Sequence, residues 1–343
     1  KFDESKFDPN YPQMRIWVEA GVASGIPYLA EQLEKVGKTF EPGTTAKELK
    51  EYFESPEVKY KPIVVLLKNG EYTLSETAVR IYSGATLIGE SRDGVVIHVS
   101  GKAGISLYNG KGVGLRNLTL EGKWSDSPPD PSEFSEVLQG MGDHRMIDMA
   151  KCENSFVDNV RILNSASHPV WLSGNNNTLR MLEIDGAYCK GAGCQGYLFL
   201  DGQRNLITRC KVTRIRHISF QNPSSKENVF FDNDVRQEVS FHTNDGGDNL
   251  IENNRITIPR HMKAYNAIMG PWSKQHKVGG KNFIYNNECE EENNRKRPWS
   301  DSKLYTGPFF VSNQNNRDRY DNFRPVETPL PKGETLYPVI LEP

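Results

Sequence analysis

The sequence predicts an all-β fold, a right-handed parallel β-helix in which short strands wind into stacked coils. Three observations predict it. Short blocks that open on a polar residue recur at intervals of 22, 28, 23, 21 and 33 residues from Ser155 onward, close to the period of about 20 to 25 residues typical of solenoids. The blocks are rich in β-branched and aromatic residues and too short for helices. Asn, Asp and Gly separate them, as expected at the corners of coils.

The repeat is clearest between Asn205 and Ile256, where the chain reads NLITRCKV, NVFFDNDV and NLIENNRI. Asn at a repeated corner tolerates a left-handed backbone and can hydrogen-bond to its copy one coil away. We therefore expect a ladder of Asn side chains along the solenoid. The blocks open on Asn177, Asn205, Asn228, Asn249 and Asn282, with weaker openings at Ser155 and Val113.

The chain divides into three parts. Residues 1–58 show apolar residues at helical spacing, with Thr45 as a helix cap, and are predicted to form a helical cap over the open end of the solenoid. Residues 59–290 form the β-helix, with strands from Ile63 onward. Residues 291–343 form an irregular coil and tail packed on it. An excursion from Glu121 to Met146, rich in Pro and acidic residues, is a surface loop suited to form one wall of a binding cleft.

Composition excludes two classes of protein. A formal net charge of −2 over 343 residues argues against a general nucleic-acid binder, and no run of about 18 apolar residues could span a membrane. The chain begins with Lys and shows no signal peptide, so we interpret it as a trimmed or mature form and expect a secreted or periplasmic location. The five cysteines form no zinc pattern, and Cys189 and Cys194 could pair in an oxidising compartment.

Basic residues are concentrated in the late coils. A local basic surface on a near-neutral protein suits an anionic polymer, although a solvated face partly offset by nearby Glu residues is the alternative. The crowded positions are Arg255, Arg260, Lys263, Lys274, Lys277, Lys281, Arg295, Lys296 and Arg297.

Each coil carries a second strand, and alignment of these strands predicts which side chains face outward. Strand residues alternate between core and exterior. The columns expected to face the core are Trp171, Phe199, Phe220, Phe241, Met269 and Pro169, Tyr197, Ile218, Val239, Ala267. The columns expected to face outward are His168, Gly196, His217, Glu238, Asn266 and Leu172, Leu200, Gln221, His242, Gly270.

Because adjacent coils lie about 4.8 Å apart, the outward columns predict one polar patch that contains two histidines and a carboxylate. Histidine, with an unperturbed pKa of about 6.5, is suited to remove the C5 proton of a uronic acid, and a neighbouring carboxylate would orient it. We expect His217 or His242 to act as the base, with Glu238 as the orienting group. Tyr265 is the expected acid.

Substrate binding is assigned to polar and basic neighbours of this patch. Asn266 or Gln221 is expected to bind the substrate carboxylate, and His168 shares the outward column. The alternative is that the polar groups on the outward face only satisfy one another. The basic residues expected to attract the polyanion are Arg236, Arg260, Lys263 and Lys274.

The Asn-rich repeat, over residues 60–290, resembles the pectate-lyase-like superfamily of polysaccharide lyases, uronan epimerases and glycoside hydrolases. The segment from Ile218 to Gly246 loosely resembles the chondroitinase B and alginate lyase family, in which an outward Glu pair with Asn binds calcium, and a Lys and an Arg act as base and acid. Here His217 and Ser219 stand at the Glu positions, and the Lys and Arg have no match.

This resemblance implies a polysaccharide lyase, and the departures imply one without a metal. Glu238 and Asn266 alone offer too few oxygens for calcium, which takes six to eight, so no cofactor is expected. A C5-epimerase shares the first step of the lyase reaction. A non-catalytic carbohydrate-binding solenoid is the third class.

A glycoside hydrolase is the competing enzyme. The segment HTNDGGDN is similar to the NTDGxD segment of polygalacturonases, and glycoside hydrolysis needs two carboxylates. Asp245 and Asp248, however, fall in a corner where Asp is expected as a turn former.

Overall fold

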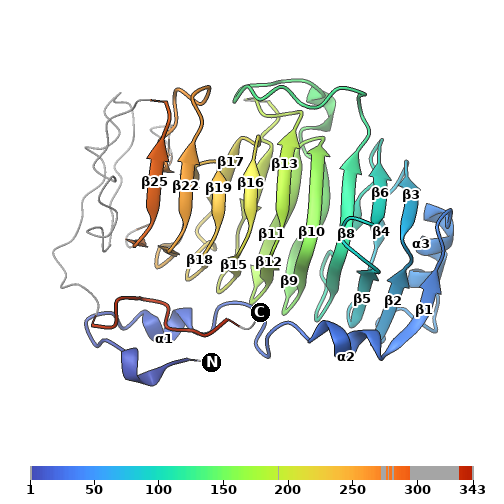
Figure 1. Cartoon of the computed structure of the whole chain (residues 1–343), viewed down its shortest axis with the longest axis horizontal. Coiled ribbons are helices and arrows are strands. Elements are labelled where there is room, and N and C mark those ends of the chain that lie inside the picture. Colours follow the sequence, from blue (N-terminus) through green and yellow to red (C-terminus); the bar gives the residue numbers. More distant parts are fainter. Residues whose placement is uncertain are drawn as a thin grey trace.

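Short strands stack one coil above another into a parallel β-helix, as the sequence predicts (Figure 1). The computed structural model describes residues 2–341 except 192, 272–275, 277, 280–281 and 294–331. Every pairing between its named strands is parallel, and the strands form three ladders along the solenoid. Within the described ranges, no helix is long and apolar enough to span a membrane.

Two ladders belong to one sheet of 17 strands and share the long strands β8 (Gly114–Gly122) and β10 (Phe156–Ser165). The first ladder also contains β1 (Val36–Phe40), β2 (Ile63–Leu67), β5 (Ala85–Gly89), β12 (Thr178–Arg180), β15 (Leu206–Thr208), β18 (Val229–Phe231), β21 (Leu250–Glu252) and β24 (Phe283–Tyr285). The second ladder also contains β3 (Gly70–Leu74), β6 (Val95–Val99), β13 (Glu183–Ala187), β16 (Lys211–Thr213), β19 (Asp234–Arg236), β22 (Arg255–Ile258) and β25 (Glu288–Glu291).

The third ladder is the separate sheet of eight strands. It contains β4 (Val79–Arg80), β7 (Ile105–Ser106), β9 (Arg145–Glu153), β11 (His168–Asn175), β14 (Tyr197–Leu200), β17 (His217–Gln221), β20 (Val239–Thr243) and β23 (Ile268–Met269).

The helices lie at the edges of this solenoid. They are the 3-10 helix η1 (Glu4–Lys6), α1 (Met14–Trp17), α2 (Leu29–Leu33), α3 (Ala46–Glu54) and the 3-10 helix η2 (Gln139–Met141). α3 begins with a capping box between Thr45 and Glu48, as expected, and lies at the end of the solenoid beside β1 and β2 (Figure 1).

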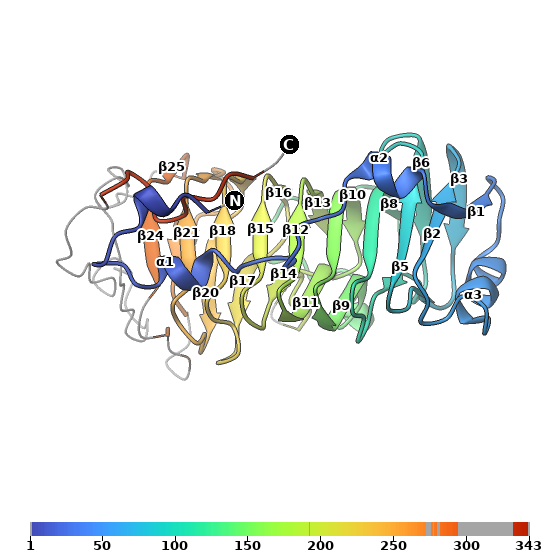
Figure 2. The same cartoon turned by 90° about the horizontal axis from the view of Figure 1, so that it is seen from below.

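The helical cap predicted over residues 1–58 forms only in part. Figure 2 shows the chain from α1 to α2 running along the side of the first ladder. Trp17 of α1 packs edge-on against Phe283 of β24, with ring centroids 4.9 Å apart. β1, also within this segment, pairs with β2, so the first coil begins before Ile63. The segment therefore fastens distant coils together as well as covering the first one.

A ladder of Asn side chains runs along one corner, as predicted. The amide of Asn228 donates from Nδ2 to Oδ1 of Asn249 at 3.0 Å, and Oδ1 of Asn228 accepts from the backbone N–H of Asn205 at 2.9 Å. The same pattern joins Asn177, Asn205, Asn228, Asn249 and Asn282. A second Asn ladder, which was not predicted, joins Asn233, Asn254 and Asn287.

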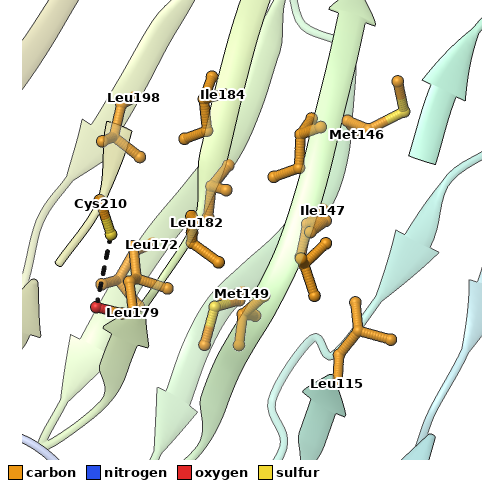
Figure 3. Packing of buried hydrophobic residues seen from close by; sticks show 14 of the residues in the cluster. Leu115, Met146, Ile147, Met149, Leu172, Leu179, Leu182, Ile184, Leu198 and Cys210 are labelled. Atoms are coloured by element: carbon orange, nitrogen blue, oxygen red, sulfur yellow. Dashed lines mark hydrogen bonds between the residues drawn. The ribbon is translucent and has the colours of Figure 1, made fainter. Parts of the chain in front are cut away.

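Aliphatic side chains from all three ladders meet inside the coils (Figure 3). Leu172 of β11, Leu179 of β12 and Ile184 of β13 are at most 1% exposed and come from the three sides of one coil. Cys210 lies among them, fully enclosed, and its Sγ contacts the carbonyl of Leu179 at 3.8 Å. The core is therefore a continuous column of side chains, and each coil buries its apolar surface on the next one.

The predicted columns of the third ladder were wrong by one residue in several coils. Strand pairing places Phe199 level with Ser219, where the prediction had aligned it with Phe220. Because strand side chains alternate, a slip of one residue exchanges the two faces. The observed inward columns are Val170, Leu198, Ile218, Val239, Ile268 and Leu172, Leu200, Phe220, Phe241.

Trp171, Phe199 and Tyr197 therefore point away from the core, contrary to the prediction. Trp171 stacks on Phe199 with centroids 3.5 Å apart and planes 9° from parallel. Outward aromatic residues cost little here because each ring covers its neighbour one coil away.

The excursion between β8 and β9 lies on the solenoid surface, as expected of a loop, and is held by a corner after β13. The backbone N–H of Lys190 donates to the carbonyl of Ser135 at 2.5 Å, and Nζ of Lys190 donates to the carbonyl of Asp130. A disulfide joins Cys189 and Cys194 in that corner. The corner after β13 therefore anchors the excursion.

Candidate active site

A histidine and a glutamate meet on the outward side of the third ladder. His217 begins β17, and Glu238 precedes β20 on the next coil, so the parallel register places the two side chains one coil apart. Nδ1 of His217 lies 2.5 Å from Oε1 of Glu238. Nε2 of Gln237 donates to Oε2 of Glu238 at 2.6 Å. His217 is 5% exposed and Glu238 is fully buried, so the pair lies below the surface.

Three further rings surround His217. The rings of His242, Tyr265 and Tyr197 have centroids 4.9, 5.2 and 5.2 Å from the imidazole. The hydroxyl of Tyr265 is buried and accepts or donates no hydrogen bond within the described part of the chain. A buried hydroxyl without a partner is costly, so this group is available to a ligand.

The two histidines differ in the roles of their ring nitrogens. Nε2 of Gln221 lies 3.0 Å from Nδ1 of His242, and an amide nitrogen can only donate. Nδ1 of His242 is therefore an acceptor, and its neutral ring carries the proton on Nε2. In His217 the glutamate occupies Nδ1, which leaves Nε2 as the atom that can act on a substrate.

Burial moves every titratable group of this cluster toward its neutral form. It lowers the pKa of His217 well below 6.5, with His242 and Arg216 adding to the shift, and lowers the pKa of His242 to about 4. Burial also raises the pKa of Glu238 well above 4.5 and that of Tyr265 well above 10. Tyr265 therefore keeps its proton at neutral pH. His217 and Glu238 share one proton between Nδ1 and Oε1.

Two charged residues border the cluster. Arg216 donates from Nη1 to the carbonyl of Gly191 at 2.7 Å, and its guanidinium carbon lies 5.6 Å from the ring centroid of Tyr197. Its charge acts on the pKa of both His217 and His242. From the excursion, the charge of Glu133 helps raise the pKa of Glu238 and Tyr265, and the adjacent Phe134 ring lies 6.4 Å from Tyr265. The excursion thus forms a wall beside the cluster.

The structure brings all four expected catalytic residues together and separates most of the expected binding residues from them. His217, His242, Glu238, Tyr265 and Gln221 lie in one cluster.

His168 and Asn266 were wrongly placed on the surface. His168 is fully buried, and its Nδ1 accepts from the backbone N–H of Tyr197 at 3.1 Å. Burial lowers the pKa of His168 to about 4. Asn266 is also fully buried, because the observed register places it level with Gln237 at the corner.

The basic residues expected around the patch are dispersed. Arg236 ends β19 in the second ladder and pairs with Glu292 at 3.4 Å. Arg260 and Lys263 are exposed in the turn between β22 and β23, the turn that carries Tyr265. Lys274 lies outside the described residues.

Arg216, Tyr197 and Ser219 also belong to the site, although none of them was predicted from the sequence as a member. Ser219 Oγ accepts from Nε2 of Gln221 at 2.7 Å and so fixes the amide that contacts His242. Arg216 directly precedes His217, and an Arg next to an outward His was the available signal. Tyr197 had been assigned to the core through the register error.

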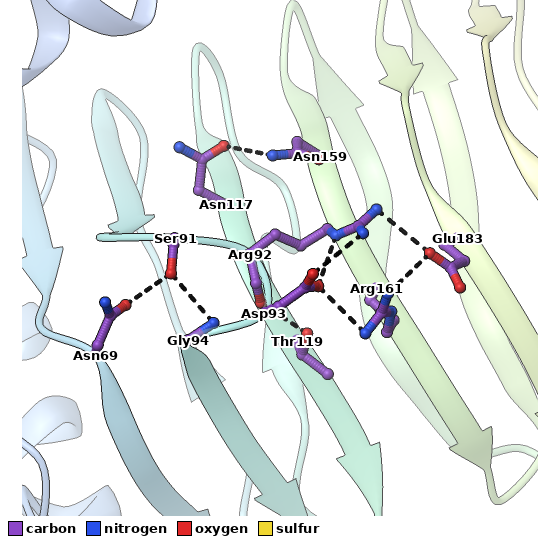
Figure 4. Close-up of polar contacts among 10 residues, drawn as sticks. All are labelled: Asn69, Ser91, Arg92, Asp93, Gly94, Asn117, Thr119, Asn159, Arg161 and Glu183. Atoms are coloured by element: carbon purple, nitrogen blue, oxygen red, sulfur yellow. Dashed lines mark hydrogen bonds and ion pairs between the residues drawn. The ribbon is translucent and has the colours of Figure 1, made fainter.

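Outward polar groups elsewhere on the solenoid satisfy one another, which is the alternative considered for the histidine patch. In Figure 4 Arg161 lies 3.2 Å from both Asp93 and Glu183, and Arg92 contacts Glu183 at 3.3 Å. That network contains fixed charges and no buried unpartnered hydroxyl among the residues drawn. The histidine cluster differs because it gathers groups that exchange protons.

Asp245, the carboxylate considered for hydrolysis, is used by the corner itself. Its side chain accepts hydrogen bonds from Gly247, Asn249, Gly279 and Asn282 at 2.9 to 3.3 Å, and it is 4% exposed. It therefore terminates the Asn ladder. In the described ranges no group of three or more His, Cys, Asp or Glu residues is arranged to hold a metal ion.

A cavity of about 740 Å³ lies away from this cluster, between the N-terminal segment and the first ladder. Asp158 at its edge is held by Arg116 at 2.7 Å and Arg180 at 2.8 Å, and Arg116 also donates to Gln32. Its charged groups are paired, so we place the candidate chemistry at the histidine cluster, where the proton-exchanging side chains lie.

Neither a protein-family model nor a curated protein sequence matches this chain. Solved structures resemble it at low identity. The catalytic domain of a GH87 alpha-1,3-glucanase is 14% identical with a TM-score of 0.49, and the match covers 87% of this chain and 51% of that one. A pectin methylesterase is 12% identical with a TM-score of 0.45, over 77% and 91% of the two chains.

Two lyases also resemble the chain. A PL6 family alginate lyase is 12% identical with a TM-score of 0.41, over 74% of this chain and 40% of that one. A pectate lyase from a Bacillus species is 13% identical with a TM-score of 0.39, over 87% and 93%. This chain spans about half of the glucanase domain. A shared fold does not determine the reaction.

Proposed function

We propose that this β-helix is a polysaccharide lyase that cleaves a uronic-acid-containing anionic polysaccharide by β-elimination. The observation that carries the proposal is the pairing of His217 with Glu238 beside the unpartnered hydroxyl of Tyr265. β-Elimination needs a base for the C5 proton and an acid for the departing O4 oxygen. This cluster contains one candidate for each role.

In the proposed reaction Nε2 of His217 removes the C5 proton, and the C5 electron pair forms the C4–C5 double bond as the bond from C4 to O4 breaks. Glu238 holds Nδ1–H of His217 and stabilises the imidazolium that forms. Tyr265, whose raised pKa keeps it protonated, donates its proton to the leaving oxygen. Each proton has a donor and an acceptor within the cluster.

Arg216 and His242 take the substrate-binding roles in this scheme. Arg216 would neutralise the uronate carboxylate, which makes the C5 proton more acidic. His242, with its proton on Nε2, donates a hydrogen bond to the substrate. We assign this role to Arg216 because Asn266 is buried at the corner and Arg236 is paired on another ladder.

A panel of polymers tests the proposal. The protein is incubated with alginate, polygalacturonate, glucuronan and chondroitin sulfate, and the ultraviolet absorbance of the unsaturated product is followed. We expect absorbance to rise with at least one polymer and His217→Ala to abolish the rise. His98→Ala is the matched control, because His98 also contacts two glutamates, at 3.4 and 3.7 Å, on the second ladder.

Other outcomes identify the other reactions. New reducing ends without absorbance would show a hydrolase, and loss of C5 deuterium from a labelled polymer without cleavage would show an epimerase. Full activity in His217→Ala would contradict the proposed base.

A further inference from the structure

The outward face that carries the histidine cluster continues to the first coils of the solenoid, where tyrosine rings and cations alternate. We name this surface the tyrosine–cation strip. Its members are Lys59, Tyr60, Arg80, Tyr82, Tyr108 and Lys151.

The members of the strip contact one another in sequence along the coils. Nζ of Lys59 lies 4.8 Å from the ring centroid of Tyr82, and the rings of Tyr60 and Tyr82 meet edge-on at 5.2 Å. The guanidinium carbon of Arg80 lies 4.5 Å from the centroid of Tyr82 and 5.3 Å from that of Tyr108. These contacts hold the cations in place over the rings.

The strip presents both apolar rings and unneutralised charge. Tyr60 is 61% exposed and Tyr108 is 36% exposed, although both are large aromatic residues. Lys59, Arg80 and Lys151 form no ion pair with a carboxylate in the described part of the chain, whereas Glu153 nearby is paired with Lys111 at 3.2 Å. Large exposed rings beside free positive charge are typical of a binding surface.

Strand register connects this strip to the histidine cluster. Arg80 pairs with Ser106, which pairs with Asp148, and Asp148 pairs with Trp171. Trp171 then pairs with Phe199, and Phe199 with Ser219 of the site. Arg80 and Ser219 therefore occupy one outward column, five coil steps apart. At about 4.8 Å per step they are roughly 24 Å apart.

We propose that the tyrosine–cation strip is a second binding site for the same polyuronate chain, several sugars away from the bond that is cleaved. The proposal rests on the lyase function proposed above. Carboxylates of the polymer would lie against Lys59, Arg80 and Lys151, and the C–H faces of its sugars would pack on Tyr60 and Tyr108. Two sites on one rigid face would hold a long chain much more tightly than a short one.

Affinity electrophoresis tests binding separately from catalysis. Native gels contain alginate, polygalacturonate or chondroitin sulfate, with dextran as the neutral polymer. We expect at least one of the three anionic polymers to retard the wild type, and dextran not to. The variants Tyr60→Ala/Tyr108→Ala and Lys151→Glu should weaken that retardation about five- to tenfold.

Two variants serve as matched controls. Tyr28→Ala removes another ring that is 55% exposed, and Lys211→Glu reverses an exposed charge on the second ladder. Both should be retarded like the wild type.

Turnover separates this inference from the proposed function. The strip variants should lose turnover of long chains and keep turnover of oligosaccharides too short to reach the strip. If retardation depends on the strip and no polymer yields unsaturated product, the strip is a binding site and the lyase function fails. The proposed role of the strip is refuted if no anionic polymer retards the wild type, or if the control variants weaken retardation equally. It is also refuted if the strip variants are retarded and turn over polymer like the wild type.

Discussion

Glu238 lies one coil beyond His217, and its Oε1 faces Nδ1 of the imidazole at 2.5 Å. Neither residue neighbours the other in sequence, since 21 positions separate them. Their meeting depends on the parallel register of β17 and β20, which pairs Ile218 with Val239. The site is therefore only as well ordered as the coil stacking that positions it.

Replacement of Glu238 by Gln tests this pair. Gln can still accept the Nδ1–H of His217 but cannot stabilise an imidazolium, so we expect the catalytic rate to fall about 10²- to 10⁴-fold. In the wild type, the rate should rise with pH as the pair loses a proton, and burial places that ionisation above the ordinary pKa of Glu, 4.5. In Glu238→Gln the rise of the catalytic rate with pH should occur at lower pH, because burial lowers the pKa of the remaining His217. Rates of product formation from pH 4 to 9 measure both effects. A pH–rate profile that is the same in Glu238→Gln as in the wild type would contradict the proposed pair.

Replacement of Tyr265 by Phe should separate activity from stability. The buried hydroxyl of Tyr265 has no hydrogen-bond partner among the described residues, so its removal should leave the unfolding temperature unchanged or higher. Activity should fall about 10²-fold or more, because the acid is lost. Tyr72→Phe is the control: its hydroxyl donates to the carbonyl of Lys68 at 2.7 Å, so this variant should lose about 1 kcal/mol of stability and keep its activity. Equal destabilisation of the two variants would argue for a structural Tyr265.

Replacement of Asn228 by Ala should destabilise the solenoid. The Asn228 side chain donates to Gly202 and Asn249 and accepts twice from Asn205, all in a buried corner. Loss of these bonds leaves buried groups unpaired, and we expect a cost of about 3 kcal/mol in chemical denaturation. Lys211→Ala, at an exposed position of β16, should cost less than about 0.5 kcal/mol.

Glu252 makes stability depend on pH. This buried carboxyl of β21 accepts hydrogen bonds from Thr335 at 2.5 Å and from the backbone N–H of Leu336 at 3.1 Å, and burial raises its pKa to about 8. A folded pKa above the unfolded value of 4.5 means that stability is lost as pH rises from about 4.5 to 8. Relative to Glu252→Gln, the wild type should lose up to about 1.4 kcal/mol per pH unit in that window. Denaturation midpoints of both proteins across this range measure the difference, and a pH-independent difference would refute it.

The disulfide between Cys189 and Cys194 should support the site through the excursion. The corner that it closes supplies the carbonyl of Gly191 to Arg216 and the N–H of Lys190 to Ser135. The double variant Cys189→Ser/Cys194→Ser should lose about 2 kcal/mol of stability, and its kcat/KM should fall several-fold. Reductant should reproduce the loss in the wild type and have no effect on the double variant. If reductant had an equal effect on both proteins, the loss would have a cause other than this disulfide.

Only part of the histidine cluster could be predicted from the sequence. The outward positions of His217 and Glu238 follow from alternation within β17 and β20, which the repeat aligns correctly as far as Phe220 and Phe241. Beyond them a register shift pairs Gln221 with Thr243, where the prediction had aligned it with His242. The register of β14 against β17 could not be predicted from the sequence, because Tyr197, Phe199 and their neighbours form an almost uninterrupted apolar run. Such a run gives no sign of which residues face the core, so Tyr197 was lost from the site and His168 was added to it.

The sequence by itself determined the architecture. Repeated Asn corners and β-rich blocks recur locally, and each coil repeats the same short-range pattern, so the solenoid can be recognised before any long-range contact is known. Tertiary structure alone decided the course of residues 2–28 along the ladder, the register of β11 and β14, and the contact of Phe134 with Tyr265. These features depend on packing between segments far apart in the chain, and such packing leaves no periodic signal in the sequence.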